Sequence, residues 1–285
     1  MRSSIPGAWR TDAVLINGFR QFCREWQPHR ETCPPVLALH GSLTQSGMWA
    51  SLAESAETIR MVCPDQRGFA LSDDPGNDAC ADFAADAVAL AQARIVGRYV
   101  VMGHSFACAI ALEAARRDAR RVAAVVLVDP VVRLGPSMAP PRTASPPESF
   151  ATVAEAANHF RTTEEGVWPE DALARFVHDI MIPDVTTGRW RFPYTPARLA
   201  RLRSFTASPA SDHDLLATAK LVHARVLVFR GGASTRFPEA AQTPFLAAFP
   251  SAPKLVVCPN SGHFPTATEP GIVVASLKSF LGELA

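Results

Sequence analysis

The stretch Val-Val-Met-Gly-His-Ser-Phe-Ala, residues 100–107, decides the fold of this chain. Its apolar start predicts a buried strand, and the alanine-rich run at residues 108–115 predicts a helix packed on the same core. Gly103 and Ala107 bracket Ser105 with small residues, which gives the G-x-S-x-G pattern of a nucleophilic serine with alanine in place of the second glycine. A Gly-Ser turn between any strand and helix would contain the same residues, so the interpretation depends on the rest of the chain.

Length and composition predict a globular protein. The chain has 285 residues, of which 48% are hydrophobic and 19% charged, and it can bury a sizeable core. Its net charge of +1 gives no reason to expect nucleic acid or a membrane surface as a partner, and no stretch approaches the roughly 20 apolar residues of a membrane span. The N-terminus has no apolar signal region. We expect a cytoplasmic protein with a small-molecule substrate, and the sequence leaves a homodimer open.

The cysteines carry no metal-binding pattern. Six of them are scattered along the sequence without the paired spacing of a metal site. Buried or incidental thiols in a reducing cytoplasm are therefore expected rather than a disulfide framework. The sequence implies no metal and no organic cofactor.

Strands and helices alternate through most of the sequence. The Asn-Gly pair at residues 17–18 predicts a hairpin over residues 13–26, because these residues favour the tight turns of hairpins. Further strands are predicted at residues 35–39, 59–64, 122–128, 226–229 and 254–257, and helices at residues 82–93 and 271–281. This alternation predicts an α/β fold, with a mostly parallel sheet that is covered by helices on both faces.

An insertion interrupts this alternation. No run fit for an inner strand occurs between about residues 134 and 221, and the Pro- and Ser-rich residues 136–147 resemble a linker. Helices are predicted at residues 150–160 and 169–181, the second of which begins with proline and two acids. We therefore expect a core at residues 1–135, a mainly helical cap at residues 136–220 and a second part of the core at residues 221–285.

Four motifs occur in order outside the insertion. They are His40-Gly41, Asp65-x-Arg67-Gly68-x-x-x-Ser72-Asp73, the Ser105 turn, and Ser261-Gly262-His263-Phe264 ahead of Glu269-Pro270. With these motifs the chain resembles the α/β-hydrolase superfamily, over nearly everything outside the insertion. The resemblance implies the α/β-hydrolase fold and makes Asp65, Arg67 and Ser72 parts of a tight structural loop.

The resemblance also implies that Ser105 is a nucleophile. A serine hydroxyl needs a base within hydrogen-bond reach, and the family's pattern places that base at His263, on the loop after the last strand. Parallel strands open their C-terminal ends on one edge of the sheet, where Ser105 and His263 would meet. His104 lies on the wrong side of the turn for this role, and His40 is the histidine of the oxyanion loop.

The acid that orients the histidine is less certain from the sequence, because the family's commonest position is vacant. The loop after the strand that ends near Phe229 contains no acid before Glu239. Some members carry the acid one strand earlier, which is Asp129 in this chain. The order Ser105, Asp129, His263 is the one expected for the fold. We therefore favour Asp129, with Glu239 as the rival and a turn residue beside Pro130 as the alternative role for Asp129.

Oxyanion and substrate contacts are predicted from the same pattern. The backbone N–H groups of Phe106 and Ser42 are expected to form the oxyanion hole. In the cap, Trp168 is a candidate for the pocket lining. Arg189-Trp190-Arg191 would present two arginines on one face of a strand, and arginine forks bind carboxylates. A solvated face with one packed tryptophan is the alternative for this triplet.

These residues predict a serine hydrolase that cleaves a small ester, amide or lactone through an acyl-enzyme intermediate. The acid after the earlier strand, and the Asp65-Gln66-Arg67-Gly68-Phe69 variant, are similar to small-amide hydrolases of heterocycle degradation such as the acetamidomethylene-succinate hydrolase. A C–C bond hydrolase or lyase that uses the same triad is an alternative. A non-catalytic small-molecule-binding member of the fold is another.

Overall fold

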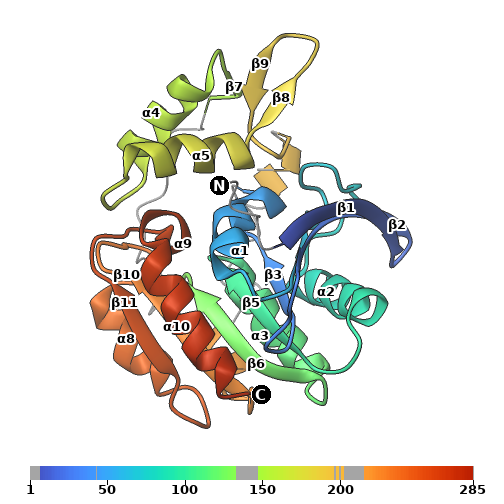
Figure 1. Ribbon diagram of the computed structural model, residues 1–285, viewed down its shortest axis with the longest axis vertical. Coiled ribbons are helices and arrows are strands. Elements are labelled where there is room, and N and C mark those ends of the chain that lie inside the picture. Colours follow the sequence, from blue (N-terminus) through green and yellow to red (C-terminus); the bar gives the residue numbers. More distant parts are fainter. Residues whose placement is uncertain are drawn as a thin grey trace.

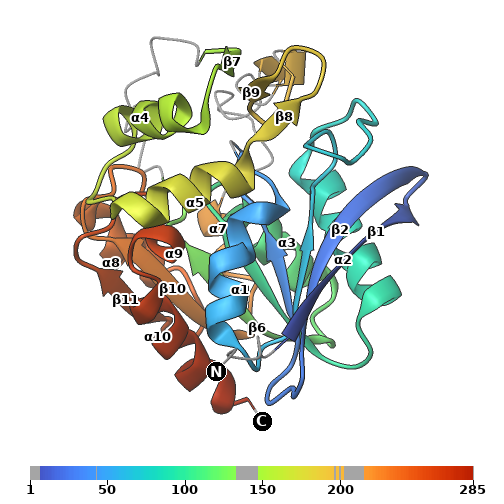
Figure 2. The same ribbon diagram turned by 45° about the horizontal axis from the view of Figure 1, so that its top comes forward.

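The computed structural model describes residues 7–42, 44–132, 147–195, 197–198, 200–201 and 215–284. Its centre is an eight-stranded sheet in the order β1-β2-β4-β3-β5-β6-β10-β11, which Figures 1 and 2 show in two views. The strands are β1 (Gly7–Ile16), β2 (Phe19–Pro28), β3 (Val36–Leu39), β4 (Met61–Pro64), β5 (Tyr99–His104), β6 (Val122–Val128), β10 (Arg225–Gly231) and β11 (Lys254–Cys258). From β4 to β11 all neighbouring strands pair in parallel. The predicted α/β fold is therefore confirmed.

The first two strands form the predicted antiparallel hairpin. Asn17 and Gly18 both have positive φ, 48° and 85°, as the tight two-residue turn between β1 and β2 requires. β2 then pairs with β4 in the antiparallel direction, with Cys23 opposite Pro64. The hairpin thus extends the parallel part of the sheet at one edge.

Helices cover both faces of the sheet. Their bounds are η1 (Ser46–Trp49), α1 (Ala50–Ala56), α2 (Cys80–Arg94), α3 (Ala107–Arg117), α7 (Leu215–Ala219), α8 (Glu239–Leu246), α9 (Pro265–Thr268) and α10 (Pro270–Gly282). Side chains of β5 alternate between two cores: Val100 and Met102 pack with α1 and α10, whereas Val101 packs with α2 and α3. This alternation is the period of two that a strand buried on both faces must have.

The cap lies between β6 and β10 in the sequence and above the C-terminal ends of the strands (Figure 2). Its elements are β7 (Ser149–Phe150), α4 (Val153–Thr163), α5 (Glu170–Ile180), β8 (Ile182–Asp184) and β9 (Arg189–Arg191). The three strands form a separate antiparallel sheet, β7-β9-β8, which the expectation of a mainly helical cap did not include. Most of the predicted linker at residues 136–147, and residues 202–214 of the predicted cap, lie outside the described residues, so the domain boundaries remain predictions.

The first cap helix begins later than the sequence predicts. Phe150 belongs to β7, and α4 starts at Val153 because Thr152 caps it: the Thr152 side chain accepts a hydrogen bond from the Glu155 N–H at 3.1 Å. The Glu155 carboxylate in turn accepts one from the Ala151 N–H at 2.6 Å. This exchange resembles a capping box and fixes the start of the helix.

All six cysteines are free thiols, and five of them are buried. None of the helices in the described ranges is long and apolar enough to cross a membrane.

The loop after β4 is held by buried polar side chains. Asp65 accepts hydrogen bonds from the backbone N–H groups of Ser46 and Leu71, at 2.9 and 3.2 Å. Arg67 binds both oxygens of Asp86 in α2, at 2.6 and 2.8 Å, and both side chains are almost fully buried. A bidentate pair of this kind fixes the loop against α2. The loop in turn supports the oxyanion loop through Asp65.

Replacing Asp86 with alanine leaves the buried Arg67 guanidinium without its carboxylate. We expect the free energy of unfolding to fall by about 3–5 kcal/mol, the usual consequence of stranding one partner of a buried ion pair. Chemical denaturation measures this loss. The control is Glu113→Ala, which removes ion pairs from the partly exposed Arg116 and Arg117 and should cost less than about 1 kcal/mol. Equal losses in the two variants would contradict this account of the loop.

Candidate active site

Ser105 lies at the sharp turn between β5 and α3. Its φ is +58°, a conformation that L-residues adopt only under constraint. The turn is close-packed, because a Cβ atom on Gly103 would lie 2.2 Å from the Ala107 carbonyl oxygen. Glycine is therefore required at position 103, whereas the methyl group of Ala107 is buried in the core without such a conflict. The turn lifts the Ser105 side chain above the end of the sheet.

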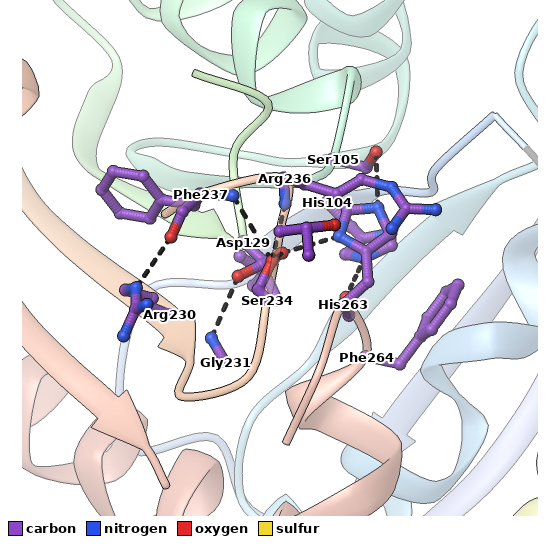
Figure 3. Close-up of polar contacts among 12 residues, drawn as sticks. His104, Ser105, Asp129, Arg230, Gly231, Ser234, Arg236, Phe237, His263 and Phe264 are labelled. Atoms are coloured by element: carbon purple, nitrogen blue, oxygen red, sulfur yellow. Dashed lines mark hydrogen bonds and ion pairs between the residues drawn. The ribbon is translucent and has the colours of Figure 1, made fainter. Parts of the chain in front are cut away.

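Three side chains form a continuous hydrogen-bonded chain at this edge of the sheet (Figure 3). His263 Nε2 lies 2.9 Å from Ser105 Oγ, and His263 Nδ1 lies 2.6 Å from Asp129 Oδ2. Because the ionised carboxylate can only accept, Nδ1 carries the hydrogen and Nε2 is left to accept the hydroxyl proton of Ser105. The three residues follow β5, β6 and β11, which end side by side or one strand apart.

Asp129 is buried completely, directly after β6, with a φ of +44°. Its Oδ1 accepts a hydrogen bond from the Gly231 N–H at 3.0 Å, and its Oδ2 accepts one from Ser234 Oγ at 2.5 Å. Burial raises the pKa of the carboxyl to about 6, while these hydrogen bonds act in the opposite direction. The rival acid Glu239 is exposed at the start of α8. The geometry therefore favours Asp129 over Glu239.

Two further histidines are buried beside the triad and hold backbone groups. His104 Nε2 lies 2.7 Å from the carbonyl oxygen of His263 and so donates to it. His40 Nδ1 donates to the Gly41 carbonyl at 2.8 Å, and its Nε2 accepts from the Gln66 N–H at 2.9 Å. Burial lowers the pKa of each imidazole to about 3, so both rings are neutral at neutral pH. They position loops and carry no charge.

The predicted oxyanion donors lie at the end of β3 and the start of α3. A Cβ atom on Gly41 would lie 2.5 Å from His104 Nδ1 and 3.4 Å from Ser105 Cβ, so the His40-Gly41 loop runs directly against the serine turn. Ser42 follows on this loop and is half-buried. Phe106 occupies the N-cap position of α3, where the first N–H groups of a helix point away from its own carbonyls. Both predicted donors thus flank Ser105.

Aromatic side chains of the cap cover one side of His263. Phe264 packs against the His263 ring, with centroids 5.2 Å apart, and against Trp168 and Phe176, at 5.8 and 5.0 Å. Phe160 also contacts Phe264, at 6.2 Å. The predicted pocket residue Trp168 therefore lies one side chain away from the catalytic histidine. Phe264 itself was named only as part of a motif, and its role in this wall needed the structure to be seen.

The other predicted cap residues lie farther out, in β9 (Figures 1 and 2). Arg189 is exposed and donates to the Ser149 side chain and carbonyl, at 2.7 and 3.1 Å. Trp190 packs against the His178 ring at 5.7 Å, and Arg191 reaches the Phe192 carbonyl at 3.4 Å. In the described part of the chain neither arginine makes an ion pair with a carboxylate. The structure thus brings Trp168, but not this triplet, against the residues around His263.

The segment at residues 164–167 fastens the cap to the loops that carry the site. Arg236, on the loop after β10, forms ion pairs with Glu165 at 2.9 Å and Glu164 at 3.3 Å. Gly166 pairs with Ser261 in an isolated β-bridge. Contact is so close that a Cβ atom on Gly262 would lie 2.0 Å from the Glu165 carbonyl oxygen. Sequence reasoning missed this contact, since only the glycine of the Ser261-Gly262-His263 motif signalled a close approach.

Within the described residues, no group of three or more His, Cys, Asp or Glu side chains is arranged to hold a metal ion.

Comparison with known proteins identifies the family. A model described as the alpha/beta hydrolase family matches residues 36–277, and the chain belongs to that family. Lipase LipV of Mycobacterium tuberculosis is 35% identical over 104 residues, which is 35% of this chain and 38% of the lipase. The match therefore spans well under half of that curated relative.

Two solved structures share the fold over almost the whole chain. An alpha/beta hydrolase from Novosphingobium aromaticivorans has a TM-score of 0.77 at 24% identity, covering 99% of this chain and 100% of that chain. E-2-(acetamidomethylene)succinate hydrolase has a TM-score of 0.71 at 21% identity, covering 96% of this chain and 99% of that one. The resemblance predicted from the four motifs is thus confirmed at the level of family and fold.

The packing of the serine turn can be tested with a pair of glycine variants. Gly103→Ala introduces a methyl group 2.2 Å from a backbone oxygen, so the turn must shift, and we expect both a loss of several kcal/mol in stability and a displaced Ser105. Gly271→Ala, in the first turn of α10 with open space around its Cβ position, should be neutral or slightly stabilising. Thermal unfolding compares the two. Tolerance of Gly103→Ala would contradict the requirement for glycine.

Proposed function

We propose that this member of the alpha/beta hydrolase family is a serine hydrolase that cleaves a small ester, amide or lactone through an acyl-enzyme intermediate. One observation carries the proposal: Ser105, His263 and Asp129 are joined by hydrogen bonds of 2.9 and 2.6 Å, with the imidazole in the tautomer that a general base needs. The family supports hydrolysis in general. The bond that is cleaved and the roles of these residues belong to the proposal.

In the first half of the reaction, Ser105 Oγ attacks the carbonyl carbon of the substrate. His263 Nε2 accepts the hydroxyl proton, and the imidazolium that results is stabilised by the Asp129 carboxylate on its other nitrogen. The carbonyl oxygen becomes negatively charged in the tetrahedral intermediate. The N–H groups of Phe106 and Ser42 would bind this oxyanion, and such donors each contribute about 3 kcal/mol to the transition state.

Collapse of the intermediate releases the leaving group, which takes the proton from His263 Nε2. The acyl group remains as an ester of Ser105. A water molecule then attacks this ester while His263 again removes the proton, and a second tetrahedral intermediate returns Ser105 to its free state. Neutral His40 and His104 add no competing charge near the developing oxyanion.

The aromatic wall around His263 supports a substrate with an apolar portion. Phe264, Trp168 and Phe176 present apolar surface beside the base, and such surface binds apolar groups by removing them from water. One curated relative is named a lipase, and one solved neighbour is named for a succinate derivative. Ester and amide substrates of modest size, with or without a carboxylate, are therefore the first to screen.

The nucleophile and base can be tested by p-nitrophenyl acetate and butyrate hydrolysis. Ser105→Ala and His263→Ala should each remove nearly all turnover, and Asp129→Asn should lower kcat by about 10⁴, because the imidazole then adopts the wrong tautomer. Glu239→Gln is the matched control and should keep the wild-type rate. If Glu239→Gln lowers kcat and Asp129→Asn does not, the assignment of the acid is wrong.

The same assay separates the alternatives. Serine-dependent release of p-nitrophenol supports acyl transfer. Equal rates in folded wild type and Ser105→Ala would contradict it and would favour the binding-only member of the fold. With a natural substrate, release of an acid together with an alcohol or amine supports the hydrolase, whereas a cleaved carbon skeleton would indicate the C–C hydrolase or lyase.

The two arginines of β9 remain candidates for binding an anionic substrate. If they bind a carboxylate, Arg189→Ala and Arg191→Ala should each raise KM about tenfold for anionic esters and leave KM for neutral esters unchanged, since a hydrogen bond to a charged group contributes ~1.5–3 kcal/mol. Arg161→Ala, which removes an exposed ion pair of α4, is the control. Equal effects on neutral and anionic esters would exclude this role, as the outward position of β9 would suggest.

A further inference from the structure

Ser234 contacts the same carboxylate oxygen as the catalytic histidine. It lies on the loop after β10, and its side chain is buried with 4% of the residue exposed. Ser234 Oγ is 2.5 Å from Asp129 Oδ2, and His263 Nδ1 is 2.6 Å from that same atom. Figure 3 shows the two groups meeting at Asp129 from different loops. Sequence reasoning treated this loop only as one that lacks an acid.

The neighbouring backbone decides the direction of the Ser234 hydroxyl. Ser234 Oγ accepts hydrogen bonds from the Arg236 N–H at 3.2 Å and the Phe237 N–H at 3.4 Å. An N–H group can only donate, and a hydroxyl has one proton and two lone pairs. The single proton of Ser234 is therefore left for Asp129, which accepts it as a carboxylate.

We propose that Ser234 is a positioning residue of the triad: its hydroxyl holds Asp129 in the ionised state and aims Oδ2 at His263. The proposal rests on the proposed function for its consequence in catalysis, although the contact itself does not depend on it. Asp129 has no exposed surface, so water cannot supply a missing donor. Ser234 and the Gly231 N–H are the donors that oppose the effect of burial, which by itself raises the pKa of Asp129.

The other ionisable groups around Asp129 do not change charge near neutral pH. Burial lowers the pKa of His104, at the end of β5, to about 3, so it stays neutral. Burial also raises the pKa of the Cys108 thiol in α3 well above its usual range, and that of Cys258 in β11 to about 12. Arg236 keeps its positive charge and is paired with Glu164 and Glu165. The pair His263–Asp129 therefore dominates the titration at this position.

The sign of the expected effect follows from which state the hydroxyl stabilises. The active form has neutral His263 and ionised Asp129, and the Ser234 hydrogen bond lowers the free energy of that form. Without the hydroxyl, the pair binds a proton more readily and its apparent pKa rises. The acid limb of kcat/KM then moves to higher pH, so activity is lost at acidic pH and recovers as pH rises.

The direct test is an NMR titration of the His263 ring in ¹⁵N-histidine-labelled protein, with the signal assigned by comparison with His263→Asn. Ser234→Ala should raise the apparent pKa of the pair by about one to two pH units, the effect of one hydrogen bond to a charged group. Thr235→Val is the matched control: it removes the hydroxyl of the next residue, which bonds to Glu165, and should leave the titration unchanged. An unchanged titration in folded Ser234→Ala would overturn the proposal.

Kinetics then separate positioning from a merely structural role. In Ser234→Ala, kcat/KM should fall at least tenfold on the acid limb and approach the wild-type value at high pH, whereas general damage to the loop would lower it at every pH. Ser234→Cys keeps the side-chain shape with a weaker donor and should shift the limb by a smaller amount; it serves as the test if the alanine variant does not fold. In an Asp129→Asn background the Ser234→Ala change should produce no further shift.

The two proposals fail in different ways. Because the NMR titration needs no substrate, a wild-type protein without serine-dependent turnover would contradict the proposed function while the titration still tests Ser234. Conversely, normal turnover with an unchanged titration in Ser234→Ala would overturn only the role of Ser234.

Discussion

A buried carboxylate is the constraint on which the rest of the site depends. Asp129 has no contact with water, and an ionised group there is stable only if hydrogen-bond donors replace its hydration. Its donors come from the ends of two other strands: Gly231 and Ser234 after β10, and His263 after β11. These strands can supply them together because β6, β10 and β11 are neighbours in a parallel sheet and end on the same edge. The topology thus makes the charge tolerable, and the charge then orients the base.

The cap is tied to the same loops rather than resting on the core as a separate body. Arg236 and the Ser261-Gly262 backbone contact the segment at residues 164–167, and both lie within three residues of a group that binds Asp129. Phe264 then carries the contact from the base to Trp168 and the other cap aromatics. Substrate binding under the cap and the geometry of the triad are therefore linked through short, close-packed pieces of backbone.

Much of this arrangement could be predicted because it follows local rules. The Asn17-Gly18 turn, the apolar strands and the order of Ser105, Asp129 and His263 are all readable from composition and spacing or from the family pattern. The small cap sheet was missed because strands of two or three residues are too short to show a period of two. Ser234 was missed for a different reason. Its role depends on Asp129, 105 positions away in the sequence, and a serine carries no signal of which carboxylate it will meet.

The central claim is that Ser105 is a nucleophile activated by the His263–Asp129 pair. Reaction of the folded protein with a fluorophosphonate, followed by mass spectrometry of the intact protein and its peptides, tests it most directly, because such reagents need an activated serine and no knowledge of the substrate. The account predicts one phosphonyl group per chain, located on Ser105, and much slower labelling of Asp129→Asn. A folded wild-type protein that stays unmodified, or one labelled at another residue, would contradict it.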